Sequence, residues 1–180
     1  MLGSKDLQTI ASTYLYLSAQ YTSILMTMDE RELNKVPYTG SWTAAQVIQH
    51  IGKANHSGFL SAPGQKAHRD IGEQIPMLER EFLNFDIKMY SPDFLIPANR
   101  TYTKQETLEI IQIGVQSLAE NLPKGDLTLI LETPLGIVTK LELVNFIVFH
   151  SKRHLHQLDK IQIALRPNET PRLIDLKNVF

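Results

Sequence analysis

Residues 139–157 read TKLELVNFIVFHSKRHLHQ and join a long apolar run to two closely spaced histidines. Thr139 and Glu142 have the spacing of a capping box, in which the two side chains satisfy the first free amides of a helix. The run from Leu141 to Phe149 is apolar on nearly every helical face, which is typical of the most buried helix in a bundle. We therefore predict a helix over residues 139–165, ending before a proline.

The two histidines of this helix, His150 and His154, are four residues apart and so share one face. Two neutral imidazoles aimed at one volume are a ligand pair for a divalent transition metal. His50, in a second amphipathic segment, is a candidate third ligand. Gln157 lies on the same side as His154, where it could orient a histidine, hold a metal-bound water or simply pack. A buried water or a nearby carboxylate would also satisfy the imidazoles.

The other three histidines have less favourable positions. His56 lies roughly 240° further round its helix than His50, and His156 lies about 200° from His154. His68 falls in a connector that contains glycine and proline. We expect all three to face solvent, although His156 could donate a hydrogen bond at an interface.

Three further helices are expected, over residues 4–28, 43–61 and 103–122, and the last two begin with capping boxes at Thr43 and Thr103. The region between the second and third is irregular, with helical character over residues 74–85 and an extended segment over residues 89–100. Residues 127–138 could form a short strand or hairpin. The prediction is an all-α four-helix bundle, a single domain over residues 1–180, with an irregular connector between helices two and three.

The composition excludes several classes of protein. The 180 residues are 43% hydrophobic and 21% charged, and 18 Lys and Arg balance 19 Asp and Glu, so we expect no nucleic-acid partner. There is no cysteine, which excludes disulfides, thiolate nucleophiles and cysteine-ligated zinc. We find neither a signal peptide at the N-terminus nor an apolar run long enough to span a bilayer, so we expect a cytoplasmic protein with no membrane partner.

Four motifs together resemble one family. They are Trp42-Thr-x-x-Gln-x-x-x-His50-Ile, His150-x-x-x-His154-x-x-Gln157, Ser91-Pro-Asp-Phe-Leu-Ile-Pro and Thr133-Pro-Leu-Gly. In spacing and order they resemble the DinB-like superfamily, which includes the YfiT-type proteins regarded as metal-dependent hydrolases. The resemblance covers roughly residues 5 to 165.

This resemblance implies a DinB-like bundle of up-down-down-up topology, commonly a homodimer. It also implies a divalent metal, zinc or nickel, held by His50, His150 and His154. Three protein ligands leave a coordination position open, which is the pattern of a catalytic metal site, where bound water can reach a pKa of about 7.

Two classes of function remain open. One is an enzyme that activates water, as a hydrolase, or a thiol, as an S-transferase, on a small-molecule substrate. The alternative is a non-catalytic metal-binding or stress-response protein acting as a dimer, and a metal-free bundle that works through dimerisation is a weaker third reading. The sequence contains no His-Glu-x-x-His motif, serine nucleophile motif or glycine-rich phosphate loop. Catalytic residues, substrate and reaction are therefore not predicted.

Overall fold

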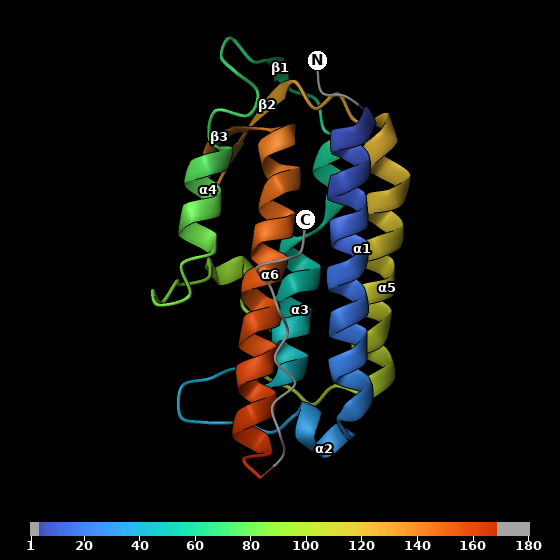
Figure 1. Ribbon diagram of the computed structural model, residues 1–180, viewed down its shortest axis with the longest axis vertical. Helices are drawn as coiled ribbons and strands as arrows, with labels where there is room; N and C mark the ends of the chain where they lie inside the picture. The colour runs from blue at the N-terminus through green and yellow to red at the C-terminus, as the bar shows by residue number, and fades with distance from the viewer. Residues whose placement is uncertain (1–3, 169–180) are drawn as a thin grey trace.

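The fold is described from a computed structural model over residues 4–168, so the two ends of the predicted domain, residues 1–3 and 169–180, lie outside the described residues. Four principal helices pack along the long axis of the molecule (Figure 1). They are α1 (Ser4–Thr27), α3 (Ala44–Ala54), α5 (Lys104–Asn121) and α6 (Lys140–Leu165). Figure 1 shows α1 and α6 running in one direction and α3 and α5 in the other. This is the predicted up-down-down-up bundle.

Local sequence signals start the helices. The predicted capping boxes at Thr43, Thr103 and Thr139 are all present, each with reciprocal bonds between the threonine and the residue three positions on. A further capping box, which we did not predict, begins at Asp29 and starts the short helix α2 (Glu30–Leu33). The starts of α3, α5 and α6 are therefore confirmed.

The end of the second predicted helix differs from expectation. We predicted that it would run to residue 61, whereas α3 ends at Ala54 and a 3-10 turn, η1 (Ser57–Ser61), follows. Two polar side chains separate these elements. Asn55 is the C-cap of α3 and is buried, and the imidazole of His56 accepts a hydrogen bond from the amide of Gly58 at 3.0 Å. These side-chain bonds replace continued helix.

The connector between α3 and α5 carries little regular structure, as expected. It contains the two-residue strand β1 (Gln65–Lys66), the helix α4 (Ile75–Phe82) and the 3-10 turn η2 (Asp93–Leu95). The helical character predicted over residues 74–85 thus corresponds to α4, which packs against α6. After α5, one more 3-10 turn, η3 (Leu122–Lys124), leads into the hairpin.

The predicted hairpin is formed by β2 (Leu129–Thr133) and β3 (Gly136–Thr139), which pair antiparallel. Gly136 has a φ of 92°, a conformation that favours glycine, directly after the two-residue turn. Strand β1 adds to the other edge of β2, a pairing between residues far apart in sequence that we did not predict. Thr139 ends β3 and is also the N-cap of α6, so the hairpin leads directly into the helix with two of the three histidines.

Buried polar bonds fix the start of α6. The Glu142 carboxylate, fully buried, accepts two bonds of 2.7 Å from the Arg69 guanidinium and one of 2.8 Å from the amide of Gln74. Lys140, also buried, donates to the carbonyls of Leu60 and Ala62 at 2.8 and 2.6 Å. The connector before and after β1 is therefore tied to the first turn of α6.

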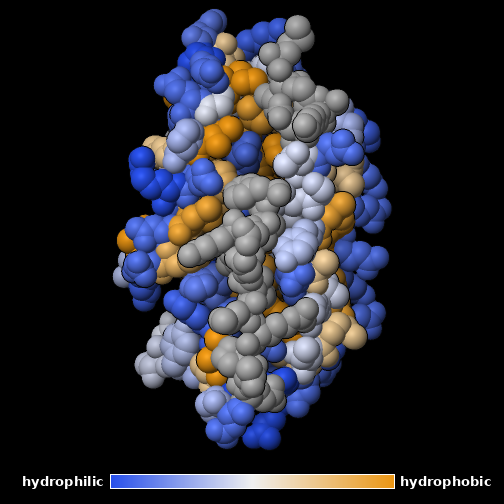
Figure 2. Space-filling view, viewed as in Figure 1, coloured by the Kyte–Doolittle hydropathy of each residue, from blue (hydrophilic) through white to orange (hydrophobic). Residues whose placement is uncertain are grey.

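Two apolar clusters fill the bundle, one between α1, α3, α4 and α6 and the other nearer the hairpin, around Leu118, Leu141 and Val144. On the face drawn in Figure 2, hydrophilic residues cover most of the surface and hydrophobic residues show as separate patches. Of the helices within residues 4–168, none combines the length and apolar character that crossing a membrane requires.

Candidate metal centre

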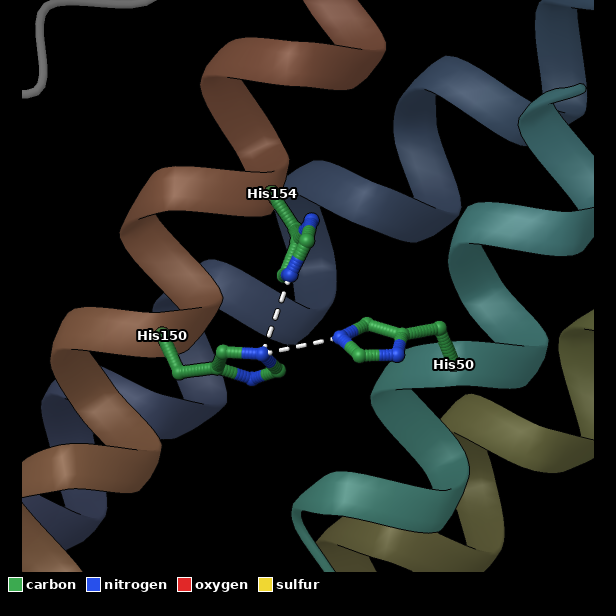
Figure 3. Close-up of side chains that lie close together, drawn as sticks. All are labelled: His50, His150 and His154. Carbon is green, nitrogen blue, oxygen red and sulfur yellow. Dashed lines mark hydrogen bonds between the residues drawn. The ribbon is translucent and has the colours of Figure 1, made fainter. Parts of the chain in front are cut away.

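Three histidines from two helices meet inside the bundle (Figure 3). The Nε2 atom of His150 lies 3.1 Å from Nε2 of His50 and 3.0 Å from Nε2 of His154. All three ligand atoms lie within 4.8 Å of one another. His50, His150 and His154 are 4%, 5% and 9% exposed, so the cluster is buried and retains only a small accessible area.

In each imidazole the second ring nitrogen, Nδ1, lies within hydrogen-bonding distance of an oxygen atom. Nδ1 of His50 lies 3.0 Å from the carbonyl oxygen of Leu95, which can only accept. Nδ1 of His150 lies 2.9 Å from the side-chain oxygen of Asn55, and Nδ1 of His154 lies 2.8 Å from the side-chain oxygen of Gln157. We assign a proton to each Nδ1 on the basis of these oxygen partners. The three Nε2 atoms then carry lone pairs.

This donor set suits a cation. With Nδ1 protonated on every neutral ring, three Nε2 lone pairs face one another and no proton lies between them. Tetrahedral zinc, with bonds to nitrogen of about 2.0–2.1 Å, separates its ligand nitrogens by roughly 3.3 Å, close to the separations of 3.0 and 3.1 Å around His150. Among the described residues the cluster contains three histidines and no Asp or Glu. The residues therefore fit a divalent metal with a position left for another ligand.

Burial keeps the rings neutral. It lowers the pKa of His154 from 6.5 to about 3. His50 lowers this pKa further, and its effect is larger than the opposing effect of the hydrogen bond that His154 makes to Gln157. Burial and the charges of its neighbours hold the pKa of His150 well below its ordinary value. Burial also lowers the pKa of His50, although the hydrogen bond that its ring makes to the Leu95 carbonyl acts in the opposite direction. Neutral imidazole is the form that binds metal.

Aromatic rings surround the imidazoles. The ring of Trp42 lies 5.0 Å from that of His50, and Phe146 stacks on His150 with ring centroids 5.0 Å apart and an interplanar angle of 29°. Phe82, from α4, meets His150 edge to face at 6.1 Å. These contacts restrict ring rotation and remove water from the sides of the cluster.

Two positively charged side chains close to the histidines in sequence, Arg153 and Lys53, bind carbonyl groups of the connector. Arg153 donates to the carbonyls of Phe82, Asn84 and Ile87, and Lys53 donates to the carbonyl of Ile96 at 2.7 Å. Together with the bond from His50 to the Leu95 carbonyl, these side chains attach the residue 82–96 segment to α3 and α6.

The structure brings together the three histidines predicted as ligands and places the side-chain oxygen of Gln157 against Nδ1 of His154. His56 and His68 are exposed, as expected. His156 differs from expectation, because it is half-buried and stacks on Phe85 with ring centroids 4.3 Å apart. The aromatic side chain of the connector covers this ring, and no local pattern predicts that contact.

Two supporting groups were missed. Asn55 lies five residues after His50, where we expected continuing helix, and an asparagine near a helix end is ordinarily explained as a cap. The Leu95 carbonyl is a main-chain atom of an irregular segment, so no side-chain pattern identifies it. The end of α3 at Ala54, which frees the Asn55 side chain to reach α6, is visible only in the structure.

Comparison with known proteins agrees with the fold. Residues 15–158 match the family model of the DinB superfamily. Among solved structures, the chain is similar to YfiT from Bacillus subtilis, described as a probable metal-dependent hydrolase with an unusual four-helix bundle topology. The TM-score is 0.59 at 12% sequence identity, covering 92% of this chain and 90% of that one, which indicates a shared fold. A comparison with curated proteins finds no match.

Proposed function

Because this chain belongs to the DinB superfamily, we propose that it is a divalent-metal-dependent enzyme acting on a small molecule. His50, His150 and His154 are the proposed ligands, and Gln157 orients His154. The observation that carries the proposal is the meeting of three Nε2 atoms around His150 at 3.0 and 3.1 Å, each on a ring whose Nδ1 already has an oxygen partner. The description of YfiT as a probable metal-dependent hydrolase supports it.

A divalent transition metal held by three imidazoles supplies Lewis-acid activation of water or a thiol. The residues of this chain bind and orient it. The three rings donate from Nε2, the oxygens of Leu95, Asn55 and Gln157 fix their rotation, and the surrounding aromatic rings exclude water. We propose zinc or nickel as the metal, and hydrolysis or thiol S-transfer as the reaction. A cytoplasmic homodimer is the accompanying expectation from sequence and resemblance.

A non-catalytic metal-binding protein is the second candidate. It is favoured by the burial of the histidines, none of which is more than 9% exposed. The enzyme is favoured by the composition of the cluster, which has three protein ligands and no acidic fourth one within the described residues.

Metal analysis tests the shared part of both candidates. Purified protein is expected to contain close to one equivalent of zinc or nickel, and His154→Ala should lose most of it. His56→Ala, which removes an exposed imidazole that is not part of the cluster, is the matched control. Equal metal content in the wild type and His154→Ala would contradict the proposed site.

A spectroscopic titration separates the two candidates. In cobalt-substituted protein, adding azide or a small thiol should change the visible spectrum if a coordination position is open to exogenous ligands. An unchanged spectrum at saturating ligand would favour the non-catalytic role.

A further inference from the structure

Asn55 is not part of the predicted metal-binding motif, although its side chain contacts His150 of the cluster. It is 3% exposed and lies immediately after α3. Its backbone amide satisfies the cap by donating to the carbonyl of Ile51 at 2.8 Å. The side-chain amide is therefore not needed for capping, and burying it without partners would be costly. Two of its side-chain bonds go instead to α6, and a further one joins it to the hydroxyl of Tyr14 on α1.

Those two bonds connect Asn55 to consecutive residues of the neighbouring helix. The side-chain oxygen lies 2.9 Å from Nδ1 of His150, and the side-chain nitrogen donates to the hydroxyl of Ser151 at 2.9 Å. The backbone carbonyl of Ser151 in turn accepts from the hydroxyl of Tyr21 on α1. Buried hydrogen bonds thus connect Tyr21 on α1 with Ser151, Ser151 with Asn55, and Asn55 with the imidazole of His150.

The three imidazoles do not depend on equivalent supports. His154 is held by Gln157 of its own helix, three residues along, and His50 is held by a main-chain carbonyl of the connector. The hydroxyl of Ser91, also in the connector, lies 3.4 Å from the same nitrogen of His50, Nδ1. Among the three rings, only His150 is held by a side-chain amide from outside its own helix, that of the residue that caps α3. His150 is also the ring whose Nε2 makes both close contacts, at 3.1 Å to His50 and 3.0 Å to His154. The hydrogen bond with Asn55 is therefore made by His150, the ring that contacts both of the other two.

We propose that Asn55 is a positioning residue for the metal site, which keeps His150 in the tautomer and rotation that turn its Nε2 toward the other two rings. This inference rests on the proposed function. Without the Asn55 oxygen, Nδ1–H of His150 loses its partner in the interior, and the ring gains the alternative tautomer, in which Nε2 carries the proton and cannot ligate. Groups that orient metal-ligating histidines typically change metal affinity by about 10–100-fold when removed.

The test compares three amide substitutions. Asn55→Leu removes the acceptor at similar volume, and Asn55→Asp keeps an oxygen for His150. Asn121→Leu is the matched control, because the Asn121 amide lies at the end of α5 and donates to Ser117 and Ser57 rather than to an imidazole. Zinc affinity is measured for each by competition with a chromophoric chelator, and unfolding in excess chelator is measured separately. Asn55→Ser provides the same comparison with a milder change should Asn55→Leu not fold.

Asn55→Leu is expected to bind zinc about 10–100-fold more weakly than the wild type. Asn55→Asp should restore binding to the wild-type level or better, and Asn121→Leu should stay within about twofold of the wild type. A purely structural role would lower the stability of the metal-free protein in both leucine variants while leaving the zinc affinities equal, and that result would overturn the inference. So would an Asn55→Asp variant that folds but binds as weakly as Asn55→Leu. Failure of the wild type itself to bind zinc would instead overturn the proposed function.

Discussion

Lowering the pH should destabilise the metal-free protein through His154. Burial, with the neighbouring His50, holds the pKa of this imidazole at about 3 in the folded protein, whereas in the unfolded chain it returns to about 6.5. The unfolded state therefore binds a proton at pH 5 that the folded state does not. The stabilising contribution is complete above pH 6.5 and is lost as the pH falls toward 3.

The size of the effect follows from the two pKa values. Each pH unit between them is worth about 1.4 kcal/mol, so His154 alone should reduce the free energy of unfolding by about 2 kcal/mol at pH 5.0 relative to pH 7.5. The pKa values of His50 and His150 are shifted in the same direction. The total loss in the wild type should therefore exceed the loss due to His154.

Urea unfolding of chelator-treated protein at pH 7.5 and pH 5.0 measures this loss. The wild type should lose about 2 kcal/mol more than His154→Gln over this interval. His56→Gln, which alters an exposed imidazole, should behave as the wild type does. The reasoning is refuted if His154→Gln loses as much stability as the wild type, because the buried neutral imidazole would then not be the source.

Two other substitutions test the supports of α6 and of the cluster. Glu142→Gln should lower the free energy of unfolding by about 2 kcal/mol, measured in urea, because Arg69 and the amide of Gln74 lose a charged, buried acceptor; a loss below about 1 kcal/mol would contradict this. Gln157→Ala should weaken zinc binding by about 10–100-fold, measured by chelator competition, because His154 loses its Nδ1 partner. Unchanged affinity would show that this bond does not position the ring.

The parts of the fold that could be predicted are those determined by residues close together in the sequence. A threonine followed three residues later by Gln or Glu marks the starts of α3, α5 and α6, because both partners of a capping box lie within one helical turn. The end of α3 was predicted wrongly, since a buried asparagine replaced the next turn of helix. The pairing of β1 with β2 joins residues about 65 positions apart, and no periodicity within either strand identifies the partner.

In the candidate site too, the local part was predictable from the sequence and the part that depends on topology was not. The i,i+4 spacing of His150 and His154 fixes their shared face, so this half of the cluster is readable from sequence. Their convergence with His50 depends on the bundle topology, because only an arrangement with α3 beside α6 brings together residues 100 positions apart. The resemblance supplied that topology; the spacing of residues did not.

Burial and hydrogen bonding act on the imidazoles in ways that together favour metal binding. Burial lowers the pKa of all three rings and so keeps them neutral at ordinary pH, but a neutral imidazole can carry its proton on either nitrogen. The oxygens of Leu95, Asn55 and Gln157 select Nδ1 for that proton. A buried cluster that served packing alone would be more stable with protons shared between the Nε2 atoms, because each such bond would satisfy two buried polar groups. With the protons assigned to Nδ1, the Nε2 atoms cannot form such bonds, and a cation that accepted their lone pairs would stabilise the arrangement.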